Sequence, residues 1–285
     1  MTQHFPTRQL RFFLTAPTPC PYLPGREERK VFAHLPLSDG PTVNDSLTQV
    51  GFRRSQNIAY RPACETCRAC QSARAPAGEY VLSRSERKVL GRNGDLQRHL
   101  VEAEATLEQF ELLRRYLLTR HADGGMAEMT WPDYVAMVED TAVRTHLIEY
   151  RLRSQDRGPG DLIACVLVDV LADGLSLVYS FYDPTQVKRS LGSFIILDHI
   201  VQAGVNSLPY VYLGYWVPGS EKMAYKARYS PLEILKPGGW ALMSARERGA
   251  RPPKPLSGGG TRNAGVELSD AEPAELAGFP APGKP

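Results

Sequence analysis

Long hydrophobic runs are missing from this chain of 285 residues. None approaches the roughly 18 residues that a membrane-spanning helix requires, and the apolar residues 12–14 are too few for the core of a signal peptide. Cysteine is scarce as well, and its odd number of five is untypical of the disulfide frameworks of secreted domains. We therefore expect a protein without membrane contact that works in the cytoplasm.

Charge of one sign is not in large excess, since the formal net charge is +3, but it is unevenly distributed. Residues 1–98 contain 15 Lys and Arg against 8 Asp and Glu, a balance of +7, whereas residues 99–285 contain 19 against 23, a balance of −4. A basic amino-terminal part beside a slightly acidic remainder predicts a polyanionic partner for the former. Ordinary variation of surface charge is the alternative.

Composition divides the chain into three parts. Residues 1–98 carry short strand signals separated by Pro and Gly, residues 99–248 carry longer periodic segments, and residues 249–285 are rich in Pro, Gly and Ala without periodicity. We expect a basic, cysteine-bearing amino-terminal domain, a larger second domain and a disordered tail. The tail has too little apolar surface to offset the entropy lost on ordering it.

Periodicity predicts the elements of both domains. In the first, it indicates a short helix from Asn44 with Gly51 as its carboxyl cap, and strands at residues 10–14, 30–35, 58–61 and 72–76. In the second, it indicates helices at residues 106–121, 131–140, 191–205 and 222–229, and strands at residues 146–153, 162–171, 175–182 and 210–217. Asp123 and two glycines end the first of these helices, and Asp173-Gly174 predicts a hairpin. By analogy, this order matches an α+β fold with a GNAT-like (acyl-CoA N-acyltransferase-like) second domain.

Three cysteines are closely spaced. Cys64, Cys67 and Cys70 form a C-x2-C-x2-C pattern, and Cys20 is a distant fourth. Two-residue spacing lets successive thiolates face one centre, as zinc and iron–sulfur sites require. No histidine lies nearby, so reduced structural thiols in a tight loop are the alternative. Cys165 lies in an apolar strand and is expected in the core.

A run of cations follows the cysteines. Arg84, Arg87, Lys88 and Arg92 are spaced so that a helix or short arm presents them on one side. Such a stripe can neutralise several phosphates, and its binding should then weaken steeply with salt. A solvated charged surface is the alternative.

Residues 180–194 lead from a strand into a helix, where an acetyltransferase would bind the pyrophosphate of coenzyme A. The pattern Gln/Arg-x-x-Gly-x-Gly/Ala fits at Arg189 and Gly192 but ends on Phe194, where a small residue should let the backbone approach phosphate. This departure argues against coenzyme A as a cofactor.

Aromatic residues and cations are interleaved in residues 208–235. Five tyrosines and Trp216 stand there beside Lys222, Lys226 and Arg228. The mixture suits a cleft that binds an anionic, base-bearing ligand by charge and stacking. Packing in a core or groove is the alternative for each tyrosine.

Several long blocks occur in a recognisable order between about residues 10 and 240. They are CPYLPGR (20–26), GFRRS (51–55), YRPACETCRAC (60–70), SRSERK (83–88), RHADGGM (120–126), YSFYDPTQVKRSLGSF (179–194) and YVYLGYWVPGSEKMAYKARYSPLEIL (210–235). In wording and order the chain resembles the arginyl-tRNA–protein transferase family, and more closely its bacterial branch, the aspartate/glutamate leucyltransferases.

The resemblance implies peptide-bond formation without the ribosome. An aminoacyl group moves from its tRNA to the α-amine of a protein that begins with Asp or Glu, and the product is a degradation signal of the N-degron pathway. Leucyl-tRNA and proteins with amino-terminal Asp or Glu are the implied partners, and the transfer requires no cofactor. Eukaryotic members carry C-x2-C near the start, where this chain has Leu23 after Cys20. Zinc or an iron–sulfur cluster at the cysteines therefore stays an open alternative, with Cys20, Cys64, Cys67 and Cys70 as its ligands.

The chemistry assigns roles to named residues. An aminoacyl ester is already activated and an α-amine has a pKa of about 8, so positioning and oxyanion donors can supply most of the catalysis. Asp183, to hold the amine, and Tyr225 are the catalytic candidates. Tyr225, Tyr212 and Trp216 can stack on the terminal adenine or position the ester. For the acceptor carboxylate we expect Lys222, Lys226 and Arg228, assisted by Arg53 or, as first choice, Arg54. For tRNA we expect Arg84, Arg87, Lys88, Arg92 and Trp216.

Two other functions compete with this one. A coenzyme A-dependent acyltransferase would share the fold, but Phe194 and the basic first part argue against it. A non-enzymatic, cysteine-ligated RNA-binding module would explain the basic region, but it leaves residues 208–235 without a function.

Overall fold

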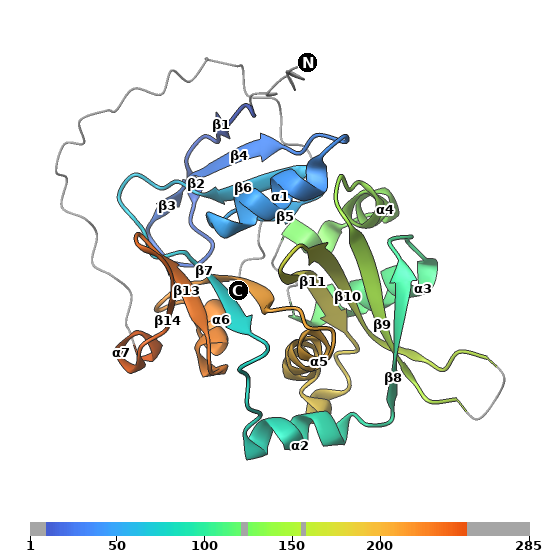
Figure 1. Cartoon of the computed structure of the whole chain (residues 1–285). Helices are drawn as coiled ribbons and strands as arrows, with labels where there is room; N and C mark the ends of the chain where they lie inside the picture. Colours follow the sequence, from blue (N-terminus) through green and yellow to red (C-terminus); the bar gives the residue numbers. More distant parts are fainter. Residues whose placement is uncertain (1–9, 121–124, 155–157, 250–285) are drawn as a thin grey trace, which may run out of the picture.

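A mixed sheet of eight strands forms the centre of the molecule. The computed structural model describes residues 10–120, 125–154 and 158–249. The strands lie in the order β14-β13-β7-β12-β11-β10-β9-β8 (Figure 1). In chain order they are β7 (Gln71–Pro76), β8 (Leu96–Glu102), β9 (Thr145–Leu152), β10 (Leu162–Leu171), β11 (Gly174–Tyr182), β12 (Tyr210–Trp216), β13 (Glu233–Lys236) and β14 (Gly239–Leu242).

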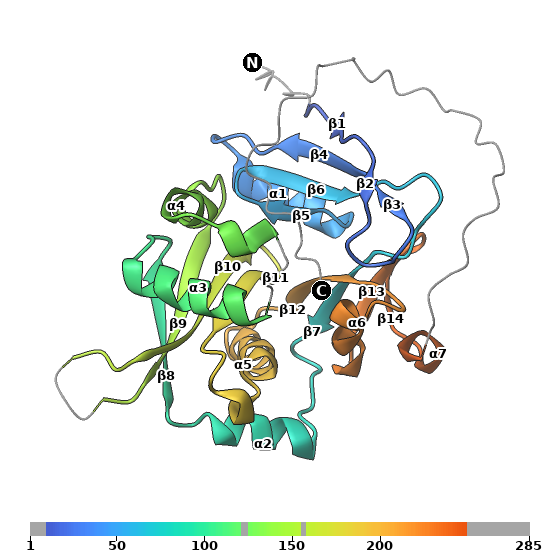
Figure 2. The same ribbon diagram turned by 180° about the vertical axis from the view of Figure 1, so that it is seen from behind.

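Helices cover both faces of this sheet, and α5 and α3 lie on opposite sides of it (Figures 1 and 2). Alternation along β10 explains why: Val166 and Val168 belong to the core that includes α5, whereas Cys165 and Leu167 belong to the core under α3 and α4. The α-helices are α1 (Gly40–Gln49), α2 (Arg84–Arg92), α3 (Leu107–Arg120), α4 (Trp131–Glu139), α5 (Leu191–Val205), α6 (Glu221–Ala224) and α7 (Ala245–Arg248), and the 3₁₀ turns are η1 (Gly125–Glu128), η2 (Val187–Arg189) and η3 (Tyr225–Arg228).

Strands β11 and β12 pair over only part of their length. They are the parallel pair of the sheet, and their pairing covers Gly174, Leu175 and Ser176 on β11. Beyond it, β11 continues against β10 as far as Tyr182, while β12 continues against β7 as far as Trp216, with a register shift at Gly214. Where they separate, the backbone groups of the two strands are not paired with each other.

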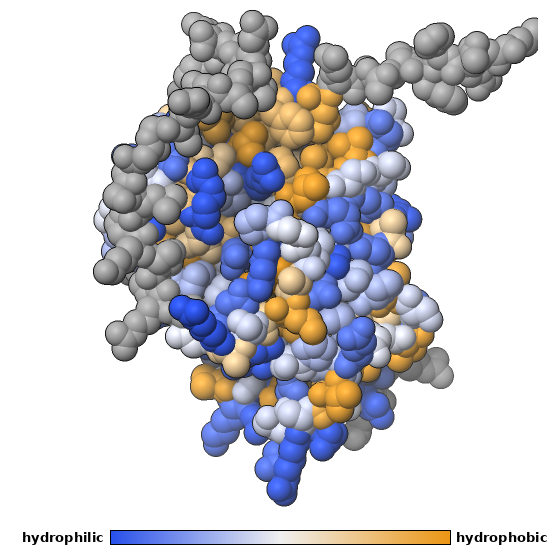
Figure 3. All heavy atoms as spheres, turned by 60° about the vertical axis from the view of Figure 1, so that its left-hand side comes forward, coloured by the Kyte–Doolittle hydropathy of each residue, from blue (hydrophilic) through white to orange (hydrophobic). Residues whose placement is uncertain are grey.

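A smaller sheet precedes the large one. Its order is β1-β4-β6-β5, formed by β1 (Phe13–Leu14), β4 (Lys30–His34), β5 (Arg53–Ser55) and β6 (Ile58–Pro62), and a separate pair joins β2 (Thr18–Pro19) to β3 (Glu27–Glu28). Helix α1 packs on it through Leu47, which shares a core with Leu35 and Phe52. Hydrophobic side chains gather at the top of the face in Figure 3, over this sheet.

The first 98 residues are joined closely to the rest of the chain. Strand β7 lies between β12 and β13 in the large sheet. The Gln49 side-chain amide at the end of α1 donates to Asp173 and to the Tyr212 hydroxyl, both at 2.8 Å. The division into domains at residue 98 stays a prediction, and the two expected domains share one sheet.

The predicted α+β class is confirmed, together with most of its elements. The helix at residues 191–205, the strand at 162–171 and the hairpin at Gly174 stand as expected. Helix α1 begins earlier than predicted, at Gly40, because Pro41 is well placed in a first turn. Strand β8 was not predicted, since its mostly exposed residues show no alternation. The end of the first long helix at His121, the stop at Asp123 and the tail beyond Gly249 lie outside the described residues.

Candidate active site

The side chains of the two arginines on strand β5 point in different directions. Successive side chains of a strand alternate in direction. Arg54 Nε and Nη2 donate to the Asp169 carboxylate at 2.6 and 2.7 Å, and the Thr145 hydroxyl donates to the same carboxylate at 2.8 Å. Both charged side chains are 1% exposed. The expectation that Arg54 binds the acceptor is therefore corrected, because its guanidinium forms a buried ion pair with Asp169.

Arg53 instead reaches the place where β11 and β12 separate. Its Nη2 donates to the carbonyl of Leu177 at 3.4 Å, just beyond the last paired residue of β11. A Cβ placed on Gly214 would lie 3.9 Å from Nε and Nη2 of Arg53 and 3.7 Å from Nζ of Lys226. Both cationic groups thus face the same stretch of β12 backbone. Sequence reasoning could not choose Arg53 over Arg54, because either face of β5 can turn toward the site.

Lys226 is the most buried of the three predicted carboxylate ligands, at 4% exposed. Its Nζ donates to the Tyr215 carbonyl at 2.5 Å and lies 3.2 Å from the Met223 sulfur. Burial, and next the neighbouring Arg53 charge, lower its pKa to about 7. No ion pair within 4.0 Å involves Lys226 or Arg53 in the described part of the chain.

Lys222 and Arg228 stand farther out on the same segment. Arg228 is exposed, donates to the Tyr225 carbonyl at 3.1 Å and lies 5.6 Å from the ring centre of Tyr225. Lys222 is half-buried on α6, and burial lowers its pKa. The structure thus places Lys226 near Arg53, while Lys222 on α6 and Arg228 on η3 are less buried.

Tyr225 stands between the cations and the start of α5. It is 38% exposed, and its ring centre lies 5.6 Å from Lys226 Nζ. Burial, and then the nearby Tyr229 hydroxyl, raise its pKa to about 12, so the phenol stays protonated and can donate a hydrogen bond. Tyr182 also interacts electrostatically with Tyr225, and its hydroxyl would lie 3.4 Å from a Cβ on Gly192, in the first turn of α5.

Asp183 follows β11 directly and lies in a turn. Its carboxylate accepts from the Thr185 amide at 2.9 Å and the Thr185 hydroxyl at 2.7 Å. Burial acts to raise its pKa, but these hydrogen bonds, aided by Gln186 and Arg115, outweigh burial and keep it below the usual value. Asp183 is consequently a stable anion beside the entry to α5.

The four predicted tRNA-binding cations all lie exposed on α2. A capping box between Ser83 and Glu86 fixes the start of this helix. Its other end is attached to the entry of α5: the Asn93 side chain donates to the Arg189 carbonyl at 3.0 Å, and Arg189 makes two 2.7 Å hydrogen bonds with Asp95. The basic helix therefore adjoins the region of Tyr182 and Asp183.

Trp216 and Tyr212 do not present stacking surfaces. Trp216 is 3% exposed and packs in the core with α5, so its predicted contact with tRNA is corrected. Tyr212 is fully buried, and its hydroxyl donates to Asp173 at 2.8 Å. Aromatic residues in strands fill cores as readily as they bind ligands.

Cys20, Cys67 and Cys70 pack against a small cluster that includes Tyr215 and Val217. Cys67 Sγ accepts from Arg26 at 3.3 Å. Burial raises the pKa of Cys70, and the other three cysteines of the predicted set raise it further, so the four thiols lie near one another. Among the described residues, however, no group of three or more His, Cys, Asp or Glu side chains is arranged to hold a metal ion. A metal site at the four cysteines stays a prediction, and no step is assigned to a metal ion.

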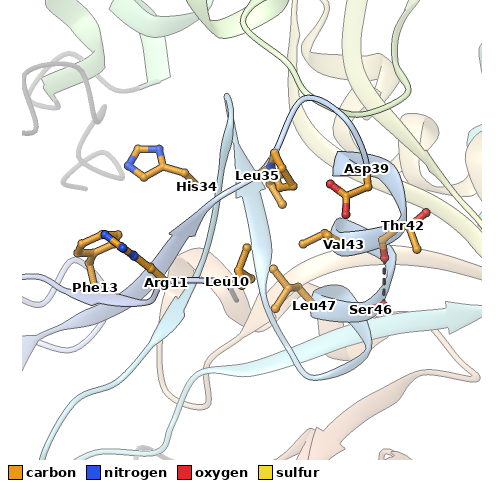
Figure 4. Close-up of a pocket in the computed structure, with 11 residues that line it drawn as sticks. Leu10, Arg11, Phe13, His34, Leu35, Asp39, Thr42, Val43, Ser46 and Leu47 are labelled. Atoms are coloured by element: carbon orange, nitrogen blue, oxygen red, sulfur yellow. Dashed lines mark hydrogen bonds between the residues drawn. The ribbon is translucent and has the colours of Figure 1, made fainter. Parts of the chain in front are cut away.

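A pocket of about 570 Å³ lies elsewhere, between α1 and the first strands (Figure 4). Val43 and Leu47 of α1 and Leu10 give it apolar walls, while His34 and Asp39 supply polar groups. None of the predicted site residues lines it.

Family models identify the class of protein. The model for the amino-terminal part of arginine-tRNA–protein transferases matches residues 18–88, and the model for their carboxyl-terminal part matches residues 108–236. Within the described residues, no helix is long and apolar enough to cross a membrane.

Similar proteins with names indicate which branch of this class the chain resembles. The chain is 87% identical over 277 residues to the aspartate/glutamate leucyltransferase of Caulobacter vibrioides, covering 97% of this chain and 99% of the relative. It is 78% identical over 258 residues to that of Phenylobacterium zucineum, covering 90% and 100%. To that of Rhodopseudomonas palustris it is 54% identical over 258 residues, covering 89% and 100%. The chain belongs to the arginine-tRNA–protein transferase family.

Solved structures resemble the chain only loosely. L-PGS from Bacillus licheniformis aligns with a TM-score of 0.42 and 11% identity, covering 67% of this chain and 57% of that one. A GCN5-related glucosamine N-acetyltransferase region of a fungal multi-domain protein aligns with a TM-score of 0.36 and 9% identity, covering 72% and 22%. Likenesses at this level carry no argument about the chain.

Proposed function

We propose that this protein transfers leucine from leucyl-tRNA to the α-amine of proteins that begin with Asp or Glu. The observation that carries the proposal is the 87% identity, over 97% of the chain, to a protein named aspartate/glutamate leucyltransferase. Family membership adds an aminoacyl-tRNA donor, since both family models describe tRNA–protein transferases.

The reaction exchanges one bond for another. The acceptor nitrogen attacks the carbonyl carbon of the aminoacyl ester, a C–N bond forms, and the C–O bond to the tRNA ribose breaks. The amine loses a proton and the ribose oxygen gains one, so no oxidant, reductant or cofactor is needed. Because the ester is activated and the amine has a pKa of about 8, holding the two in contact accounts for most of the rate.

Site residues divide this work. Asp183 is a stable carboxylate beside the entry to α5, and it is suited to hold the incoming amine before it loses its proton. Tyr225 keeps its phenolic proton and can donate to the ester carbonyl as negative charge develops there. Asp183 directly follows β11, and Tyr225 lies in η3, which comes after β12 and α6 in the chain.

The tRNA body is assigned to α2. Its four exposed cations can each neutralise a phosphate, and hydrogen bonds attach this helix to the entry of α5. The leucylated product would be a degradation signal. The expected location of the protein is the cytoplasm.

Neither competing function explains the site as well. Phe194 occupies the last position of the coenzyme A pattern, is 6% exposed and packs against Tyr150 with ring centres 5.1 Å apart, so it belongs to the core. An RNA-binding module without activity gives no role to the buried cations Arg53 and Lys226.

The proposal is tested with labelled leucyl-tRNA and two acceptor peptides that differ only in starting with Asp or Asn. We expect label in the Asp peptide and little in the Asn peptide, and no dependence on added coenzyme A or metal chelator. Label in neither peptide, with leucyl-tRNA intact, would contradict the proposed activity.

A further inference from the structure

We infer that Arg53 and Lys226 form the pocket for the side-chain carboxylate of the acceptor's first residue, where β11 and β12 separate. The inference rests on the proposed function and assigns its acceptor specificity to two named cations. Arg53 comes from the amino-terminal sheet and Lys226 from the turn η3, so the pocket joins the two parts of the chain.

Geometry brings the two cations to one point. Nε and Nη2 of Arg53 and Nζ of Lys226 all lie within 4 Å of the position that a Cβ on Gly214 would take. Gly214 has a φ of +79°, which favours glycine, and it sits at the register shift of β12. Gly214 therefore places no side chain against either cation.

Charge balance calls for an anion there. Arg53 is 7% exposed and Lys226 is 4% exposed, and neither has a carboxylate within 4.0 Å among the described residues. Asp169 interacts with Arg53 through space, but both its oxygens already accept hydrogen bonds from Arg54. Burial and the Arg53 charge lower the pKa of Lys226 to about 7, and a bound carboxylate would favour its protonated form and offset the repulsion between the two groups.

Hydrogen bonding leaves donors for that anion. Among the described residues, the Arg53 side chain makes one hydrogen bond, the 3.4 Å contact with the Leu177 carbonyl, which leaves Nε and Nη1 of its guanidinium available. The exposed ring of Tyr225 stands beside Lys226 and leads from this pocket toward α5.

A pocket of this kind distinguishes a charged acceptor side chain from a neutral one, and it tolerates a difference in side-chain length. A carboxylate pairs with both cations, whereas the amide of Asn or Gln brings no charge and presents an NH₂ group to two donors. Sites built around a specific polar group discriminate strongly against analogues that lack it, and we expect about 100-fold or more in kcat/KM between Asp and Asn peptides.

Substitution of each cation by methionine tests the assignment. Methionine keeps much of the side-chain volume, so Arg53→Met and Lys226→Met remove charge with little loss of packing. We expect KM for an Asp peptide to rise about 100-fold, the preference for Asp over Asn to fall to within a few-fold, and leucyl-tRNA affinity to stay unchanged. Arg53→Lys should recover part of the preference. The matched control is Arg246→Met, an exposed cation on α7, which should behave like the wild type.

A measurement on the wild type covers the case in which a variant fails to fold. Peptides that carry succinate or its half-amide in place of the first residue lack the amine and can only inhibit. We expect the succinyl peptide to inhibit about 100-fold more strongly than the half-amide peptide.

Equal inhibition by the two, or folded methionine variants that keep the wild-type preference for Asp, would overturn the inference. If the wild type transferred leucine to no peptide at all, the proposed function would fail instead. The two failures are thus distinguishable.

Discussion

Arg54→Met should destabilise the protein without directly changing the candidate active site. The substitution leaves Asp169, which is 1% exposed, without the two hydrogen bonds of 2.6 and 2.7 Å that compensate its charge. Removing one partner of a buried ion pair typically costs about 3–5 kcal/mol, because the other charge stays buried and unpaired. Among the side chains that the structure describes, the Thr145 hydroxyl would remain as a donor to it.

Urea unfolding followed by tryptophan fluorescence measures the effect. We expect Arg54→Met to lower the free energy of unfolding by about 3–5 kcal/mol, and Arg54→Met combined with Asp169→Leu to recover most of the loss, because the double variant buries no charge. The folded fraction of Arg54→Met should retain the preference for Asp peptides. A variant of unchanged stability that no longer distinguishes Asp from Asn would refute this reasoning and return Arg54 to the site.

Three further predictions concern other parts of the molecule. His199 is fully buried, and burial is the main cause that lowers its pKa to about 4, so the unfolded chain binds more protons than the folded protein below pH ~6.5. Lowering the pH from ~7.5 to ~5.5 should therefore reduce the free energy of unfolding by about 1.4 kcal/mol through this group, and the His199→Leu variant should not show this reduction. Replacing the four α2 cations with serine should weaken leucyl-tRNA binding and reduce its slope against log salt by about 3, measured by titration at several salt concentrations. Gly40→Ala should destabilise the amino-terminal part in thermal melts, because its Cβ would lie 2.1 Å from the Ala142 carbonyl oxygen.

For each of these three predictions, one result would contradict it. A wild type and a His199→Leu variant with the same pH dependence would rule out the buried imidazole as the titrating group. An unchanged salt slope would remove α2 from the tRNA interface. A Gly40→Ala variant with wild-type stability would mean that α1 can move away from Ala142 at no cost.

Sequence patterns predicted the strongly periodic elements and missed the features that depend on tertiary contacts. The helix at residues 191–205 was found because its apolar positions recur with a helical period, and β10 because its run is apolar apart from Asp169. Strand β8 carries no such signal, because one edge of a sheet imposes little pattern on exposed residues.

The candidate site was predicted in composition but not in arrangement. Lys226 was singled out by its aromatic surroundings, and the structure places it beside Tyr225. Arg53 and Arg54 are chemically alike and adjacent in sequence, so only the position of Asp169 on β10 decides which of them is used in the core. Trp216 looked like a stacking residue, but the strand turns it into the core with α5.

The central claim is tested most directly by incubating the full chain with a mixture of all charged tRNAs and with peptides that begin with Asp, Glu, Lys or Ala, followed by mass spectrometry. The account predicts that the Asp and Glu peptides gain the mass of one leucine residue at the amino terminus and that the Lys and Ala peptides stay unchanged. No gain on the acidic peptides, or an equal gain on all four, would contradict it.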